Sequence, residues 1–266
     1  MTYTPADSIS DHVMPVLFIG HGSPMNAIED NEFSRAWAAL GQRLPRPQAI
    51  LCISAHWQTQ GTFVTAMDEP RTIYDFYGFP QALYELSYPA PGHPQFASLT
   101  RKLVHKTEVQ LDQRWGLDHG AWCVLHRMYP QADVPVYQMS LDGTRPAQDH
   151  YELAQELQPL RRRGILIVSS GNIVHNLMLA RPGAPPYDWA VEFDQRARVL
   201  ILEGDYQALI DYPKLGRAAQ LSVPTNEHYL PLLYALALQE HDEQVSFACE
   251  QIVFGSISMR AVIIGD

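Results

Sequence analysis

Four short aliphatic runs, separated by stretches with helical spacing of apolar residues, constrain the fold of this 266-residue chain most strongly. The runs are apolar on both faces, as expected of strands that are covered on two sides. They span Val16–Ile19, Ala49–Ser54, Val134–Leu141 and Ile165–Ser169. Amphipathic helices are expected between them at Phe33–Leu44, capped by Asp30, and at His150–Arg163. This alternation predicts an α/β fold with a mostly parallel central sheet flanked by helices.

The remaining segments fit around that sheet. Tyr84–Pro94 and Arg181–Pro186 are rich in proline and are expected to be loops. Leu230–Gln239 is apolar on nearly all sides, which predicts a buried helix. Val245–Ile264 is strand-like with a break at Gly255-Ser256, so we expect C-terminal strands that add to the sheet. Without repeats or a linker, residues 14–266 are expected to form a single domain after an N-terminal extension at 1–13.

Composition excludes several classes of protein. The chain is 46% hydrophobic and 18% charged, as globular proteins are, and its formal net charge of −10 argues against a nucleic-acid partner. Its three cysteines are widely spaced and form no C-x-x-C motif. There is no signal-peptide pattern and no apolar run near 18 residues, so we expect a cytoplasmic protein without a membrane partner. No pattern in the sequence indicates an oligomeric state.

Four histidines occupy a special place in this pattern, just beyond an apolar run or at the start of an apolar helix: His21, His56, His175 and His228. In a parallel α/β sheet, residues past the carboxyl ends of the strands converge on one edge, where ligands bind. Imidazole is also the commonest side-chain metal ligand. The placement therefore predicts a metal-centred enzyme site.

Other familiar sites are missing from the sequence. It contains no H-E-x-x-H, G-x-S-x-G, P-loop or G-x-G-x-x-G motif. What remains is a dispersed histidine site. Two histidines and a carboxylate are typical of Fe(II) oxygenases, whereas three histidines with an open position suit zinc. Glu227 and His228 are neighbours and compete for the third ligand position, and spacing alone leaves that choice open.

Five short motifs surround the candidate histidines and occur in this order along the chain: Gly20–Asn26, Ser54–Trp57, Asp118–Trp122, Ser170–Leu177 and Glu227–Leu232. Together with Tyr74–Pro80 and Tyr88–Gly92, they resemble the DOPA 4,5-dioxygenase family of class III extradiol ring-opening enzymes. That family is related to the catalytic subunit of protocatechuate 4,5-dioxygenase. The resemblance runs from about Pro15 to the C-terminus.

The resemblance implies a role for each of five histidines. His21 and His56 match the family's two constant metal ligands, and His228 matches the third, where the protocatechuate relatives use a glutamate. His175 matches an acid/base histidine that can also approach the metal as a fourth ligand. His119 matches an active-site histidine expected to hydrogen-bond substrate or oxygen.

The implied activity is the extradiol opening of a small catecholic substrate such as DOPA, with Fe(II) as the working metal, Zn(II) as an alternative occupant and O₂ as co-substrate. Ser23 and Asn26 are expected to contact substrate or orient His21. An aromatic wall around the catechol is expected from Trp57, Tyr74, Phe76, Tyr77, Trp122 and Tyr229. Two alternatives remain: a zinc-dependent hydrolase that uses the same histidine cluster, and a non-catalytic metal-binding protein on the same fold.

Overall fold

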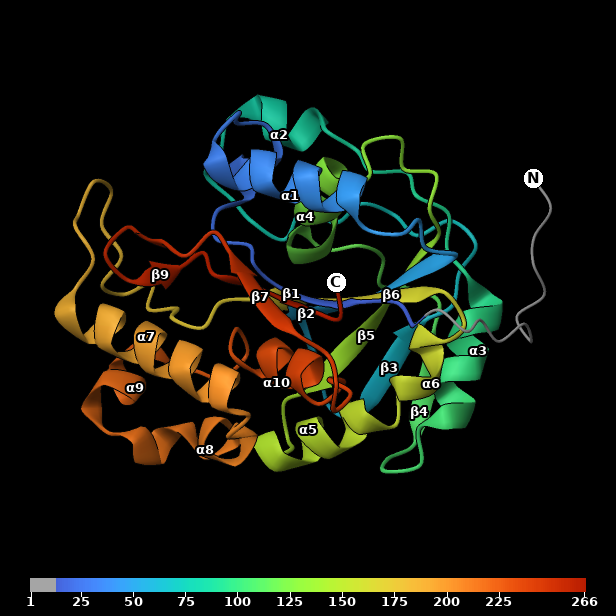
Figure 1. Ribbon diagram of the computed structural model, residues 1–266. Coiled ribbons are helices and arrows are strands. Elements are labelled where there is room, and N and C mark those ends of the chain that lie inside the picture. Colours follow the sequence, from blue (N-terminus) through green and yellow to red (C-terminus); the bar gives the residue numbers. More distant parts are fainter. Residues whose placement is uncertain (1–12) are drawn as a thin grey trace.

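An eight-stranded sheet runs through the middle of the computed structural model, which describes residues 13–266 (Figure 1). Its strand order is β4-β3-β5-β2-β6-β1-β10-β7. The strands in chain order are β1 (Val16–Gly20), β2 (Ala49–Thr59), β3 (Thr62–Thr65), β4 (Val109–Asp112), β5 (Val136–Asp142), β6 (Ile165–Gly171), β7 (Val245–Ala248) and β10 (Ala261–Ile264). The expected extension at 1–13 lies outside the described residues, apart from Val13.

The pairing is mostly parallel in the centre of the sheet. Strand β6 pairs in parallel with both β1 and β2, and β2 pairs in parallel with β5. Strand β3 pairs in parallel with β4 but antiparallel with β5. At the other edge β10 and β7 add antiparallel strands. The α/β class and the C-terminal addition to the sheet are thereby confirmed, although β8 (Ile252–Val253) and β9 (Ile257–Ser258) form a separate hairpin.

Helices cover both faces of the sheet (Figure 1). One face carries the 3₁₀ turn η1 (Pro24–Ala27) and the helices α1 (Glu32–Arg43), α2 (Gln81–Glu85) and α4 (His119–Met128). The other face carries α3 (Pro94–Leu103), α5 (Ala147–Gln155), α6 (Gln158–Arg161), α7 (Asp188–Glu203), α8 (Tyr206–Ile210), the 3₁₀ turn η2 (Tyr212–Leu215), α9 (Arg217–Ser222) and α10 (Leu230–Leu236). Among residues 13–266, no helix combines the length and apolar character needed to cross a membrane.

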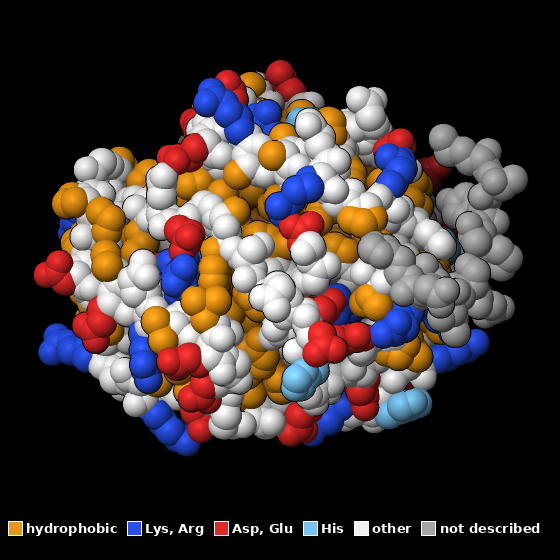
Figure 2. Space-filling view, viewed as in Figure 1, with side chains coloured by type: hydrophobic (Ala, Val, Ile, Leu, Met, Phe, Trp, Pro, Cys, Tyr) orange, Lys and Arg blue, Asp and Glu red, His pale blue; other side chains and the backbone are white. Residues whose placement is uncertain are grey.

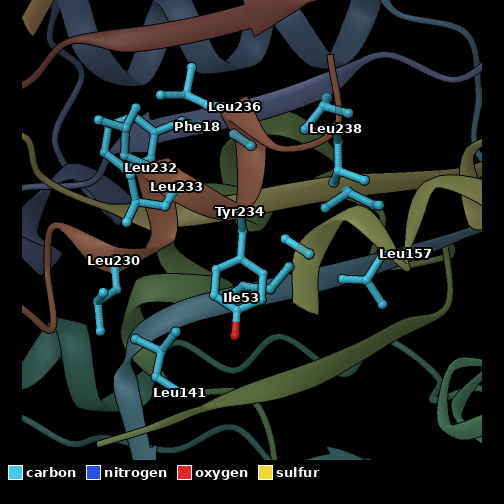
Figure 3. Close-up of a cluster of buried hydrophobic side chains, with 14 of the residues drawn as sticks. Phe18, Ile53, Leu141, Leu157, Leu230, Leu232, Leu233, Tyr234, Leu236 and Leu238 are labelled. Atoms are coloured by element: carbon cyan, nitrogen blue, oxygen red, sulfur yellow. The ribbon is translucent and has the colours of Figure 1, made fainter. Parts of the chain in front are cut away.

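Each face of the sheet has its own hydrophobic core, because successive side chains of a strand point to opposite sides. Val16 and Phe18 of β1 belong to one core, whereas Leu17 and Ile19 belong to the other. Helix α10 is buried along its whole length, as expected from its sequence, and its side chains lie close to Phe18 and Ile53 of the sheet (Figure 3). On the face seen in Figure 2, acidic and basic side chains are interspersed with small apolar areas.

Three expected boundaries differ from the structure. Helix α1 is capped by Asn31, whose side chain accepts from the Ser34 backbone N–H at 2.9 Å, and not by Asp30, which instead accepts from Arg35. The helix expected at His150–Arg163 is two helices, α5 and α6, because Pro159 at the start of α6 cannot donate a helical hydrogen bond. The expected loop at Tyr84–Pro94 begins inside α2 and ends at the first residue of α3.

Candidate metal centre

Five histidines lie around one cavity at the carboxyl ends of the central strands. His21 follows β1, His175 follows β6, and His56 lies in β2 where its pairing with β5 shifts register. His119 is the first residue of α4, and His228 lies just before α10. All five line the same cavity. The parallel order of β2, β6 and β1 brings together residues that are far apart in the sequence.

Three of these histidines form the strongest candidate for a metal site. The Nε2 atoms of His21 and His56 are 3.1 Å apart, and one ring nitrogen from each of His21, His56 and His228 lies within 4.8 Å of the others. The ring centroid of His228 lies 5.3 Å from that of His21 and 4.9 Å from that of His56. Glu227 does not belong to this group and instead lies near His175 and His228. Three converging imidazoles suit one divalent first-row cation.

The electrostatics of the three histidines favour neutral ligands. Burial, followed by repulsion from neighbouring histidines, holds the pKa of His21 and of His228 well below the ordinary histidine value. Burial and then His119 lower the pKa of His56 to about 3. Neutral imidazoles keep a lone pair for a cation at pH 7. The site therefore needs no proton release from these rings before it binds a metal.

The second ring nitrogen of each candidate ligand faces an oxygen atom. Nδ1 of His21 lies 3.0 Å from Ser170 Oγ, Nδ1 of His56 lies 3.4 Å from Asp75 Oδ2, and Nδ1 of His228 lies 3.2 Å from Glu227 Oε1. Histidines that ligate metals commonly donate their other N–H to such a group, which fixes the ring and its tautomer. The oxygen atoms that face the second ring nitrogens are therefore also what a metal site of three histidines requires.

The cavity has a volume of about 450 Å³, within the range of small-molecule sites. Apart from the histidines, it is lined largely by apolar side chains, which include Phe76, Phe79, Leu177, Ala180, Pro182, Phe254 and Ile257. His175 is largely buried beside Glu227, and burial lowers its pKa to about 4. The cavity therefore combines a cluster of histidines with largely apolar walls.

Ser23 and Asn26 occupy different places at this site. Ser23 lines the cavity, and its hydroxyl accepts from the Met25 backbone N–H at 3.2 Å. Asn26 is buried, and its side-chain amide donates to the His21 backbone oxygen at 3.1 Å. Asn26 was expected either to contact substrate or to orient His21. Its hydrogen bond fits the second role.

Trp57 and Tyr229 do not line the histidine cavity, contrary to the expected aromatic wall. Trp57 follows His56 in β2 and stacks on Trp115, with ring centroids 5.6 Å apart, beside a separate cavity. Tyr229 is fully buried and donates its hydroxyl to the Leu209 backbone oxygen at 2.8 Å. Each follows a candidate ligand directly and its side chain packs elsewhere, so we leave both out of the substrate site. Of the other expected wall residues, Phe76 lines the cavity, whereas Tyr74, Tyr77 and Trp122 do not.

Two polar residues of the site were not expected from the sequence. Asp75 lines the cavity between His56 and His119, and Ser170 holds His21 from the end of β6. Burial raises the pKa of Asp75, but its contacts with His119 and His56 together bring it below the ordinary value. Both residues lie inside motifs that carry the family resemblance, which is the one sequence signal that points to them.

The fold and the site together define an α/β protein with a cluster of histidines that could hold a metal ion, and comparison with known proteins identifies its family. Residues 9–262 match the family described as the catalytic LigB subunit of aromatic ring-opening dioxygenase, and the chain belongs to this family. It is 48% identical to 4,5-DOPA dioxygenase extradiol of Escherichia coli K12, over 95% of each chain. It is 38% identical to the enzyme of the same name from Beta vulgaris, over 85% of this chain and 87% of that one.

A solved structure agrees with this assignment. The crystal structure of an uncharacterized protein from Escherichia coli K12 superposes with a TM-score of 0.83 at 43% sequence identity. The match covers 95% of this chain and 100% of the other. The family resemblance inferred from the five motifs is confirmed by the family match and by the similar enzymes.

Proposed function

We propose that the protein is an Fe(II)-dependent extradiol dioxygenase that opens the ring of a catechol such as DOPA with O₂. One observation carries the proposal: three converging imidazoles share a largely apolar cavity with two further histidines. Membership of the ring-opening dioxygenase family and the names of the similar enzymes support it.

The donor set fits the proposed metal. His21, His56 and His228 would hold the ion, and three protein ligands leave coordination positions open for other molecules. Bound Fe(II) would supply the redox chemistry between catechol and O₂, which Zn²⁺ lacks. We therefore propose Fe(II) as the working metal and Zn(II) as an alternative occupant.

His119 and His175 would move the protons. They line the cavity beside the trio: His119 has its ring centroid 3.9 Å from that of His56, and His175 has its centroid 3.5 Å from that of His228. A catechol must lose a hydroxyl proton before its ring is opened, and a proton must be returned later. Positioned histidines can do both, and such transfers typically contribute about 10²–10⁴-fold to the rate. Phe76 and Ile257 would confine the ring and exclude water.

The test is anaerobic reconstitution with Fe(II), followed by air and L-DOPA. We expect O₂ consumption and a yellow semialdehyde-type product. A panel that includes unsubstituted catechol, 4-methylcatechol and dopamine separates a wrong substrate from a wrong reaction. Absence of O₂ uptake with every catechol would reject the proposal. Hydrolysis that persists with Zn²⁺ under anaerobic conditions would favour the zinc hydrolase instead.

A further inference from the structure

One carboxylate, that of Asp75, faces two histidines that have different positions in the site. Its Oδ2 atom lies 3.4 Å from His56 Nδ1 and 3.0 Å from His119 Nδ1. Its Oδ1 atom accepts from the His119 backbone N–H at 2.9 Å. The side chain is only 18% exposed. Asp75 thus touches a candidate metal ligand and a histidine outside the ligand trio at once.

The backbone around Asp75 explains why it meets His119. Thr72 and Leu117 form a parallel bridge, and the Ile73 N–H donates to the Leu117 oxygen at 2.8 Å. The Trp122 indole donates to the Ile73 oxygen at 2.9 Å from within α4. The two segments therefore run side by side, with Asp75 reaching the first residue of α4. A carboxylate is also electrostatically favoured at the N-terminus of a helix.

The nearby carboxylate favours one tautomer in both rings. Because an ionised carboxylate can only accept, an Nδ1 that carries the proton is attracted to Asp75 Oδ2, which lies 3.4 Å from His56 Nδ1 and 3.0 Å from His119 Nδ1. Nε2 of His56 then keeps its lone pair, and this is the atom 3.1 Å from His21 Nε2. Nε2 of His119, a ring that lines the cavity, keeps its lone pair too. A neutral ring in this tautomer can accept a proton at Nε2.

We propose that Asp75 is a positioning residue shared by both parts of the site: it presents His56 Nε2 to the metal and His119 Nε2 to the catechol hydroxyl as proton acceptor. The role of His119 rests on the proposed function, whereas the role of His56 requires only that the trio binds a metal.

An asparagine at position 75 separates these contacts from the shape of the side chain. The amide has one acceptor oxygen in place of two. It can therefore accept from the His119 backbone N–H or face the two Nδ1–H groups, but not both. Ser170 provides the matched comparison, because its hydroxyl faces only His21 among the five histidines. Asp133 provides the control, since it pairs with Arg46 on the surface at the opposite end of β5.

The experiment compares Asp75→Asn, Ser170→Ala and Asp133→Asn in two assays. Zn²⁺ affinity is measured on metal-free protein by competition with a chromophoric chelator. Next, kcat and KM are measured with 4-methylcatechol at saturating Fe(II). We expect Asp75→Asn to lower both Zn²⁺ affinity and kcat, each by about 10–100-fold, the usual effect of removing an outer partner of a ligand. Ser170→Ala should lower Zn²⁺ affinity through His21 alone, and Asp133→Asn should change neither Zn²⁺ affinity nor kcat.

A double variant tests whether Asp75 acts through His119. His119→Gln should lower kcat and leave Zn²⁺ affinity within about threefold of wild type, since His119 lies outside the ligand trio. Adding Asp75→Asn to it should lower kcat no further, because coupled residues are not additive. Multiplicative losses in kcat would overturn the role of His119, and wild-type Zn²⁺ affinity in Asp75→Asn would overturn the role of His56.

Two further outcomes remain informative. Asp75→Glu moves the carboxylate while keeping its charge, so this variant should show smaller losses of both Zn²⁺ affinity and kcat. Asp75→Glu replaces Asp75→Asn if the asparagine variant does not fold. In that case, wild-type Zn²⁺ affinity and kcat in Asp75→Glu would overturn the proposal. If wild-type protein cleaves no catechol, the proposed function fails, yet the Zn²⁺ measurements still decide whether Asp75 presents His56.

Discussion

His175 and His228 stack face to face, with ring centroids 3.5 Å apart and ring planes within 9° of parallel. The backbone of His175 is held by its N–H, which donates to the Ser222 oxygen at 2.8 Å, and by a bridge to Ile257. We therefore expect His175 to lie beside the metal ligands and not among them. Consistent with this, His175 groups with Glu227 and His228 but not with His21 and His56.

This stacking predicts that His175→Ala separates metal binding from catalysis. Metal content should stay near that of wild type, while O₂ uptake with a catechol should fall about 10²-fold or more, because a proton carrier is lost. Metal analysis and an oxygen electrode measure the two effects. His241→Ala, at a fully exposed position, serves as the control. Equal loss of metal and activity would show that His175 is instead a ligand.

The sheet and the helix α10 could be predicted because an element that is buried on both sides is apolar at nearly every position of its sequence. Val16–Ile19 and Ile165–Ser169 are apolar without alternation, and they form two central strands that pair in parallel with each other. The histidines beyond those runs were found for the same reason, since the ends of neighbouring parallel strands share an edge. The part of the site that follows strand ends is therefore predictable.

The rest of the site depends on packing that no local pattern records. Trp57 and Tyr229 adjoin candidate ligands in sequence, yet their side chains pack away from the cavity. Asp75 lies in a loop, 44 positions before the His119 N–H that it accepts from. That contact exists because Thr72 bridges Leu117, a tertiary pairing without periodicity in either segment. Adjacency to a ligand in the sequence therefore does not place a side chain in the cavity, and a residue far away in the sequence can contact one.

Gly171 should be required for the placement of His228. A Cβ atom at this position would lie 2.1 Å from the His228 backbone oxygen, which also accepts from the Asn172 N–H at 2.8 Å. Gly171→Ala must therefore push the His228 segment away. We expect Zn²⁺ affinity to fall at least about 10-fold and stability to fall by about 1–3 kcal/mol, the usual cost of overpacking. Chelator competition and urea unfolding measure the two effects.

Gly143 provides the control for that substitution, because a Cβ atom there meets nothing closer than 3.7 Å. Gly143→Ala should leave Zn²⁺ affinity unchanged. If Gly171→Ala bound Zn²⁺ as tightly as wild type, the close approach of β6 to His228 would not matter for the site.

Metal-free protein should lose stability as the pH falls below 6.5, in part because of His56. Burial lowers the folded pKa of this residue from 6.5 to about 3. Between these values an unfolded chain binds a proton at His56 that the folded chain does not, so the free energy of unfolding decreases with falling pH. One such proton contributes up to about 1.4 kcal/mol per pH unit.

Chemical unfolding of metal-free wild type and His56→Gln from pH 7.5 to 5 isolates this effect, since both chains share the remaining titrating groups. The variant should show a shallower decline below pH 6.5. Parallel curves for the two proteins would mean that His56 is not buried as a neutral ring.

The buried ion pair of Asp194 and Arg260 should support the site from a distance. Both side chains are almost fully buried, with Arg260 Nη2 2.5 Å from Asp194 Oδ2, and the Ser258 hydroxyl donates to Asp194 Oδ1 at 2.6 Å. The Arg260 backbone oxygen accepts from the Gly20 N–H at 3.2 Å, directly before His21. The pair therefore anchors the strand end against which the first candidate ligand is placed.

Arg260→Met should lower the free energy of unfolding by about 3–5 kcal/mol, because it leaves the Asp194 carboxylate buried without its cation. Asp194→Leu together with Arg260→Met should cost less than Arg260→Met alone, since no buried charge is then left unpaired; Glu250, which also pairs with Arg260, is partly exposed and keeps Arg198. Guanidinium unfolding of the metal-free proteins measures both. A loss below about 1 kcal/mol in Arg260→Met would contradict the prediction. A double variant as unstable as the single one would show that the packing of the two side chains, and not the unpaired charge, accounts for the loss.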